Sequence, residues 1–376
     1  MDVTFVFPCL NEERFIADCI RRVRASLDED PSLKFEIVVA DNGSTDRSRE
    51  IAEERGARVV PVPSRGYGAA LRGGITAAQG KYVLFADADG TYLYEDALRL
   101  FKETAAANAD MGIASRLNGR IEAGAMPPLH RYLGTPVLTG LINVLFKGKL
   151  SDCNSGFRCV KKEAFTKWEI RSSGMEFASE LLIKALKHDA KTVEISSGLR
   201  PPPQERHPHL RTWRDGMRHL LFIFSECPAL FERAGLAVAI IATALQLAAL
   251  VTGPINVAGL NIFDLHSKAL LLLAGLVGTQ FFVFGCTCYL KSTDRPGALS
   301  RILIGMDEGV LFFLLASVLV AIVAMVGVLF FVWIKSGFGG LHLANWLISF
   351  VHFTGVLLVL CLGVLGIHVL KRYEWK

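Results

Sequence analysis

The chain has 376 residues, of which 51% are hydrophobic, and its formal net charge at pH 7 is +5. The length allows two or three domains, and so small a charge is weak support for nucleic-acid binding. Charged and apolar residues are mixed up to about position 230, whereas charges nearly vanish inside long apolar runs from Gly235 onward. This distribution argues against a chain that is soluble throughout.

The first segments alternate between strand and helix patterns. Residues 2–10 are a short β-rich run that contains Pro8, and the next stretch repeats apolar residues at helical spacing, with Asn11 as its expected N-cap. Further strands are expected at 35–41, 57–62 and 81–87, with helices at about 46–55 and 66–80 between them. Such alternation predicts an α/β fold with a mainly parallel sheet and helices on both faces.

Polar clusters follow three of these strands, at residues 8–13, 41–46 and 87–90. Ligands of parallel sheets bind beyond the carboxyl ends of the strands, so we expect the three clusters at one edge of the sheet. A single Asp at a strand end is most often a turn or helix cap. Three clusters at one edge favour a binding site.

The sequence DADG places Asp87 and Asp89 one residue apart at the end of a buried strand. Mg²⁺ and Mn²⁺ take oxygen ligands and usually bind through one or two carboxylates plus substrate phosphates. The pair is therefore expected to hold such an ion on the diphosphate of a nucleotide-linked donor. Asp41 is expected to accept a hydrogen bond from the base, a role compatible with capping a turn. The glycine-rich segment 65–74 lacks both the dinucleotide-binding and the P-loop forms.

Four long apolar runs occupy the second half of the chain, at 235–253, 269–290, 309–334 and 346–370. Each has the roughly 20 residues that a helix needs to cross a bilayer. Cationic residues gather before the first run, between the second and third, and after the fourth, so both termini and the soluble half are expected in the cytoplasm. No signal-peptide pattern starts the chain, and eight cysteines without a CxxC pair favour reduced thiols.

Two further segments have the pattern of helices that lie on a membrane surface. Residues 136–148 are apolar or small and end in a lysine and a glycine, and residues 210–226 put Trp213 and apolar residues opposite several arginines. For 136–148, packing against the core of the soluble half is equally open. We expect a catalytic domain at 1–208, an interfacial helix at 209–232 and a membrane region at 233–376.

The order of several motifs resembles that of the family 2 glycosyltransferases. The motifs are PCLNEE, DNGSTD, GYGAALRGG, DADGTY, the SR pair at 115–116, MPPLHRYLG, DCNSGFR and GMEFASELLIKA. Within the family, they are most similar to the branch that moves a sugar from a nucleotide onto a polyprenyl phosphate, the dolichyl-phosphate mannose synthase type. The resemblance covers residues 3 to about 225. It implies a Rossmann-like nucleotide-sugar-binding fold of the GT-A type and inversion at the sugar carbon.

The resemblance also implies roles for single residues. The nucleoside pocket would comprise Pro8, Asn11, Glu12 and Asp41, and the metal ligands would be Asp87 and Asp89. Arg116 and Arg131 would face the donor diphosphate and the lipid phosphate, and with Asp89 they are the expected catalytic residues. The acceptor site would include Ser155, Gly156, Arg158 and Arg206. Mannose synthases continue the metal motif with a Gln that helps to hold the ion, whereas this chain has Thr91, which leaves the third protein ligand open.

A phosphate acceptor suits this set of residues. A phosphate monoester has a second pKa of about 6, so it is already a dianionic nucleophile at neutral pH and needs cations rather than a strong base. Arginine pairs with two phosphate oxygens at once. Glu176 and Glu180, four apart on one predicted helix face, can orient a cation or act as a base.

We therefore expect a multi-pass enzyme of the inner or plasma membrane that makes a polyprenyl-phosphate-linked monosaccharide at the cytoplasmic face. Its donor is expected to carry UDP rather than GDP, and the spans are expected to allow a homo-oligomer. Two alternatives remain open: a processive polysaccharide synthase, and a lipid transporter with a degenerate transferase domain. The short membrane region and the absence of a QxxRW motif disfavour the first, and the intact Asp87 and Asp89 disfavour the second.

Overall fold

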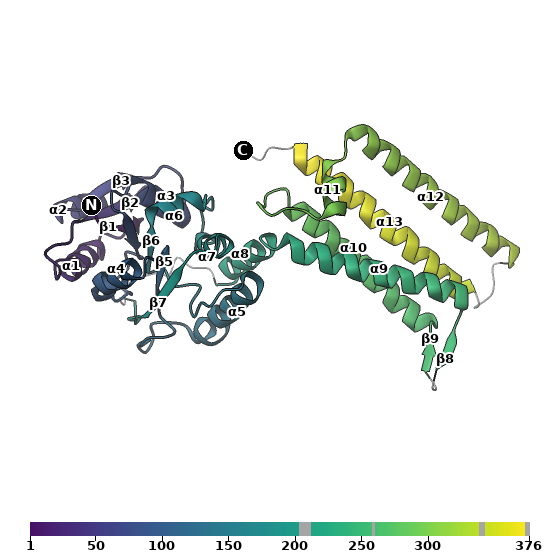
Figure 1. The fold of residues 1–376 in the computed structure, drawn as a ribbon, viewed down its shortest axis with the longest axis horizontal. Helices are drawn as coiled ribbons and strands as arrows, with labels where there is room; N and C mark the ends of the chain where they lie inside the picture. The colour runs from purple at the N-terminus through teal and green to yellow at the C-terminus, as the bar shows by residue number, and fades with distance from the viewer. Residues whose placement is uncertain (203–211, 258–259, 338–342, 373–376) are drawn as a thin grey trace. The chain divides into compact units, whose positions relative to one another are not determined.

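The structure of the protein is a computed structural model that describes residues 1–376 except 203–211, 258–259, 338–342 and 373–376. The chain divides into two compact units, Met1–Ile223 and Phe224–Lys376 (Figure 1). The first unit holds the strands and short helices of the predicted α/β domain, and the second holds the long apolar helices. Each unit is described by itself.

The first unit is built on a sheet with strand order β3-β2-β1-β4-β6-β5-β7. All pairings are parallel except those of β6, which runs antiparallel to both β4 and β5. The predicted mainly parallel sheet is therefore confirmed, although β6 was not expected. The strands are β1 (Val3–Cys9), β2 (Phe35–Asp41), β3 (Arg58–Pro61), β4 (Tyr82–Phe85), β5 (Met111–Ser115), β6 (Arg158–Lys161) and β7 (Thr192–Ser196).

Helices cover both faces of this sheet, each with its own apolar core. The first core packs α1 and α4 onto one face, and the second packs α3, α5, α6 and α7 onto the other. Both cores share the central strands, whose side chains are nearly all buried, as in sheets covered on two sides. The helices are α1 (Ile16–Leu27), α2 (Ser48–Glu54), α3 (Tyr67–Ala77), α4 (Ala97–Ala106), α5 (Thr135–Phe146), α6 (Lys162–Lys167), α7 (Phe177–Lys187) and α8 (Thr212–Ser225), with the short turns η1 (Tyr94–Asp96) and η2 (His130–Gly134).

The register of the central strands brings the three polar clusters to one edge. Cys9 of β1 lies opposite Asp41 of β2, and Val6 of β1 lies opposite Phe85 of β4. Because these three strands are parallel neighbours, the loops that follow them emerge side by side. The predicted common edge is confirmed.

The start of α1 was predicted wrongly. The helix begins at Ile16, and Asn11 lies five residues earlier in a left-handed conformation with φ of 59°. Its side-chain oxygen accepts a hydrogen bond from the backbone N–H of Thr45 at 2.8 Å, in the loop after β2. Asn11 therefore joins two loops instead of capping its own helix.

The second unit contains four helices long and apolar enough to cross a membrane, which confirms the four predicted spans among the described residues. They are α9 (Pro228–Thr252), α10 (Leu265–Cys288), α12 (Glu308–Lys335) and α13 (Leu343–Arg372), joined by the hairpin β8–β9 (Ile255–Val257, Leu260–Ile262) and by α11 (Ala298–Gly305). α9 and α10 pack closely at Gly235. A Cβ added there would stand only 2.3 Å from the backbone N of Phe282 in α10. Small residues at such contacts let helix backbones approach within a membrane.

Candidate functional site

The loop after β2 is organised by Asp41, which is 1% exposed. Its carboxylate accepts hydrogen bonds from the backbone N–H groups of Gly43 (3.1 Å) and Ser44 (3.0 Å) and pairs with Arg49 at 2.7 Å. Burial would raise the pKa of Asp41, but these hydrogen bonds and the Arg49 charge outweigh it and lower the pKa. Asp41 therefore caps a turn. Pro8 lies opposite Ala40, one residue before the neighbouring strand ends at Cys9.

Side chains lock the loops at this edge together. The backbone N–H of Glu12 donates to the Ser48 hydroxyl at 2.8 Å. Asn42 donates to the carbonyl oxygens of Val62 (3.2 Å) and Ser64 (2.7 Å) and accepts from the N–H of Gly66 (2.7 Å). Sequence reasoning missed Asn42, although it lies inside DNGSTD. The predicted nucleoside pocket is thus lined by loops that hold one another in place.

Thr91, the residue that departs from the mannose synthase pattern, orients Asp89 in the DADG loop. Asp89 is 4% exposed, and one of its oxygens accepts hydrogen bonds from the backbone N–H (2.9 Å) and the hydroxyl (2.7 Å) of Thr91. The Thr91 carbonyl in turn accepts from the N–H of Arg200 at 2.8 Å. Thr91 is therefore turned onto Asp89 and sets the direction of its carboxylate.

The buried Arg22 holds the backbone of the same loop. Arg22 of α1 donates to the carbonyl oxygens of Gly90 (3.3 Å) and Tyr92 (3.0 Å) and pairs with Glu95 at 3.0 Å. The Tyr94 hydroxyl donates to the Asp87 carbonyl and accepts from the N–H of Gly90. Sequence reasoning missed Arg22. It could have been found in the sequence as a cationic residue on the same helix face as the apolar residues of α1.

Oxygen atoms gather beside Gly156. A Cβ on Gly156 would stand 2.9 Å from the Tyr92 hydroxyl, 3.2 Å from an Asp87 carboxylate oxygen and 3.4 Å from the Tyr67 hydroxyl. The glycine thus leaves a small opening that oxygen atoms line. No group of three or more His, Cys, Asp and Glu side chains suited to a metal occurs among the described residues. The carboxylates of Asp87 and Asp89 are oxygen ligands of the kind that Mg²⁺ and Mn²⁺ take, usually one or two per ion together with phosphate and water.

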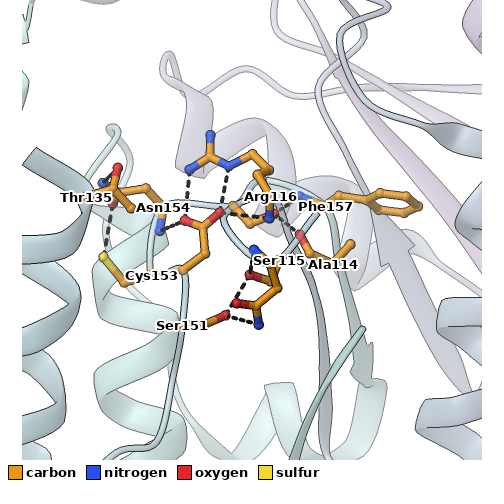
Figure 2. Close-up of polar contacts among 12 residues, drawn as sticks. Ala114, Ser115, Arg116, Thr135, Ser151, Cys153, Asn154 and Phe157 are labelled. Atoms are coloured by element: carbon orange, nitrogen blue, oxygen red, sulfur yellow. Dashed lines mark hydrogen bonds and ion pairs between the residues drawn. The ribbon is translucent and has the colours of Figure 1, made fainter. Parts of the chain in front are cut away.

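Arg116 is held by a carboxylate that sequence reasoning did not single out. Its Nε and Nη2 donate to Asp152 at 2.8 and 2.9 Å, and its backbone N–H donates to the same carboxylate at 3.1 Å. The two side chains are 12% and 0% exposed. The third guanidinium nitrogen points away from the carboxylate, as Figure 2 shows. This pairing fixes the arginine and leaves one side of its fork for another anion.

The side chains of Arg158 and Ser155, expected to contact the acceptor phosphate, donate hydrogen bonds to backbone carbonyl oxygens of the protein. Arg158 is 1% exposed, and its guanidinium donates to the carbonyl oxygens of Ser155 (2.8 Å), Ala178 (3.0 Å) and Cys153 (2.7 Å). Burial lowers its pKa. Ser155 is also buried and donates to the Ala114 carbonyl at 2.6 Å. Both side chains hold the loop that carries Gly156.

Two further arginines, Arg131 and Arg206, belong to the predicted acceptor site. Arg131 belongs to the π-helical turn η2, and its guanidinium stacks over the Tyr132 ring at 5.4 Å. π-Helical turns are rare and often occur at functional sites. Arg206 lies outside the described residues.

The two glutamates of GMEFASELL differ in their surroundings. Glu180 is 2% exposed, accepts from the backbone N–H groups of Arg171 and Ser172, and pairs with Lys184 at 3.2 Å. Glu176 precedes α7 and accepts from the N–H of Gly174 at 3.2 Å. Glu180 therefore serves the local fold.

Known proteins resemble the chain over most of its length. The low-salt glycan biosynthesis hexosyltransferase Agl6 of Haloferax volcanii is 36% identical over 349 residues, which cover 91% of this chain and 82% of that protein. A dolichyl-phosphate hexose transferase of the same organism is 29% identical over 52% of this chain and 81% of its own length.

Solved structures resemble part of the chain. Glucosyl-3-phosphoglycerate synthase from Mycobacterium tuberculosis, in complex with phosphoglyceric acid, is 23% identical with a TM-score of 0.49 and covers 60% of this chain and 80% of that one. The family model described as glycosyl transferase family 2 matches residues 4–168. With these motifs, this sheet and the Agl6 likeness, the chain belongs to the family 2 glycosyltransferases.

Proposed function

We propose that the protein transfers one monosaccharide, with inversion, from a nucleotide-diphosphate sugar to a polyprenyl phosphate at the cytoplasmic membrane surface. The observation that supports this most is the edge of the sheet where the Asp87 carboxylate lies beside Gly156 and Thr91 orients the carboxylate of Asp89, two residues further on. The printed names of two relatives, a dolichyl-phosphate hexose transferase and a dolichyl-phosphate beta-glucosyltransferase of Trichomonas vaginalis, support the lipid acceptor. We propose UDP rather than GDP as the carrier of the sugar.

Asp87 and Asp89 would hold a Mg²⁺ or Mn²⁺ ion in this proposal. When bound, the ion would neutralise charge on the departing diphosphate. The chain's own contribution is orientation, because Thr91 directs the Asp89 carboxylate and Arg22 fixes the backbone of the same loop. Pro8, Asn11, Glu12 and Asp41 would form the nucleoside end of the site.

The acceptor phosphate would act as the nucleophile without a protein base. A phosphate oxygen forms a bond to the sugar carbon from the face opposite the diphosphate, and the bond to the diphosphate breaks with both electrons leaving on its oxygen. Arg116 would draw two phosphates together, and its pairing with Asp152 through Nε and Nη2 supports this role because it fixes the guanidinium. Arg131 and Arg206 would supply further positive charge to the lipid phosphate, while Arg158 and Ser155 would shape the loop.

An apolar stripe on the first unit supports access to a lipid. Leu133, Val137 and Val144, which lie on one side of η2 and α5, are 56%, 56% and 79% exposed. Tyr132, beside them, is 72% exposed, and Thr139 and Ile142 bury the other side of α5 in the core. An apolar helix face with an aromatic and cationic border is typical of membrane-surface helices. The domain limits 1–208, 209–232 and 233–376, and cytoplasmic termini, are part of this proposal.

The test is a transfer assay with the purified full-length protein in lipid nanodiscs. Polyprenyl phosphate and a panel of UDP- and GDP-sugars are supplied, and the lipid products are weighed by mass spectrometry. One hexose added per polyprenyl phosphate, dependent on Mg²⁺ or Mn²⁺, is expected. A polymer of several sugars would favour a processive synthase, and no lipid-linked product with any donor would contradict the proposal.

A further inference from the structure

Glu176 differs from Glu180 in how its oxygens are used. Glu180 satisfies both oxygens within the loop 171–172 and with Lys184. Glu176 accepts one hydrogen bond through Oε1, from Gly174, whereas Oε2 is buried and has no hydrogen-bond partner among the described residues. A buried acceptor without a donor costs about 1–3 kcal/mol, and more when it is charged. Such an oxygen calls for a donor from outside the chain.

The position of Glu176 is set by the glycines of the GYG segment. A Cβ on Gly66 would stand 2.1 Å from the Ser173 carbonyl oxygen, and one on Gly68 would stand 2.6 Å from that of Ser172. The backbone N–H of Ala69 donates to the Ser173 carbonyl at 3.2 Å. Only glycine allows the backbone of 172–174 to come this close. The glycine-rich segment therefore serves to seat the turn that carries Glu176.

Tyr67, between those glycines, connects this turn to the metal-site carboxylates. Its ring lies edge-on to Phe177, the residue after Glu176, with centroids 6.5 Å apart. Its hydroxyl borders the opening at Gly156, and burial and the nearby charge of Asp87 raise its pKa well above the usual value. Tyr67 thus contacts the residue after Glu176 through its ring, and its hydroxyl lies near Asp87.

We propose that Glu176 Oε2 accepts a hydrogen bond from a hydroxyl group of the donor's hexosyl unit and thereby selects the sugar. The inference rests on the proposed function, because it needs a nucleotide-sugar donor with its diphosphate at Asp87 and Asp89. The sugar is then the part of the donor that lies next to those carboxylates, and a carboxylate oxygen accepts hydroxyl protons strongly. A site that hydrogen-bonds a substrate hydroxyl discriminates sharply against analogues that lack it.

The experiment compares binding of nucleoside diphosphates and nucleotide hexoses by full-length protein in nanodiscs. UDP, GDP, the matching hexose donors and their single-deoxy analogues are titrated by calorimetry with Mn²⁺ present. Glu176→Gln is expected to leave the nucleoside diphosphate affinity unchanged and to weaken the hexose donor about tenfold. One deoxy analogue should bind wild type and variant equally.

Glu180→Gln is the matched control, because its carboxylate serves the fold. It is expected to lower the unfolding temperature and to weaken nucleoside diphosphate and hexose donor to the same degree. If Glu176→Gln leaves the affinity for the hexose donor unchanged, or weakens nucleoside diphosphate and hexose donor equally, the proposed role of Glu176 is wrong. The proposed function of the protein would not be affected by that result. If wild type binds neither UDP nor GDP, the proposed function fails and this inference falls with it.

Discussion

Buried polar side chains serve different ends in the two units. In the first unit several of them are charged, and backbone groups or an opposite charge hold each of these. In the second unit most are neutral, and some of them pair between helices. The first set is Asp41, Asp89, Asp152, Arg158 and Glu180, and the second includes Gln246, Thr279, Ser349 and His352. Fixed charge suits binding of a charged donor, whereas neutral hydrogen bonds suit packing within a bilayer.

The membrane unit nevertheless has one buried carboxylate, near the start of α9. Glu232 is 6% exposed and accepts hydrogen bonds from the Tyr289 hydroxyl (2.6 Å), the N–H of Gly297 (3.0 Å) and the Ser300 hydroxyl. It therefore ties α9 to the end of α10 and the start of α11. It resembles Glu180 in the first unit, since both use a carboxylate to hold backbone.

The largest expected effect is on chemistry at the carboxyl edge. Asp89→Ala should reduce transfer about a thousandfold while the protein stays folded, because the charge that faces the diphosphate is lost. Transfer rate and Mn²⁺ affinity measure this. The control is Asp110→Ala, at the opposite edge, where the Asp110 carboxylate accepts from the Lys191 N–H at 3.0 Å. Equal rates in both variants would remove Asp89 from the mechanism.

Removal of Asp152 should have the largest effect on stability. Asp152→Ala leaves Arg116 buried without its partner, which should lower the free energy of unfolding by about 3–5 kcal/mol. Thermal unfolding in detergent measures it. A fall of less than about 1 kcal/mol would mean that water reaches the arginine and replaces the carboxylate.

The same pair predicts a pH dependence. Burial would raise the pKa of Asp152, but the Arg116 charge and hydrogen bonds lower it overall. A carboxyl group with a folded-state pKa below its unfolded value stabilises fully above the unfolded pKa and stops doing so as pH falls through the folded value. Wild-type stability should therefore fall below about pH 4. In Asp152→Asn this fall should be shallower, and an identical acid profile would contradict the assignment.

Removal of Glu232 should have a smaller effect, confined to the membrane unit. Glu232→Ala leaves the Tyr289, Gly297 and Ser300 donors without their acceptor and should destabilise by about 2–3 kcal/mol. Nucleoside diphosphate affinity should stay unchanged. Glu308→Ala is the control, because its pair with Arg372 is exposed and should contribute almost nothing.

The smallest effect is expected from the neutral pairs between spans. Gln246 donates to the Ser349 hydroxyl at 3.1 Å, and such pairs contribute about 0.6 kcal/mol in membranes. A double-mutant cycle of Gln246→Leu and Ser349→Ala measures this coupling. A coupling above about 2 kcal/mol would show that the second unit depends on polar contacts as strongly as the first.

The sequence allowed the strand edge and the spans to be predicted because both depend on local pattern. Strands that end in polar clusters, and long runs without charge, are visible in short windows. The residues that were missed depend on partners distant along the chain. Asp152 meets Arg116, which lies 36 residues before it, and Arg22 meets a loop 68 or more residues after it. Arg158 belongs to a recognisable motif, but its burial could not be inferred from the motif alone.

The close contact between α9 and α10 has a mechanical consequence. Glycines bring these two backbones together, whereas the most apolar stretch of α12 has 0% of its residues buried within the chain. A thicker or thinner bilayer should therefore tilt α12 first and leave the α9–α10 hairpin stiff. Since α9 is the span nearest in sequence to the transferase domain, sugar transfer should be insensitive to lipid chain length over the range that α12 can absorb.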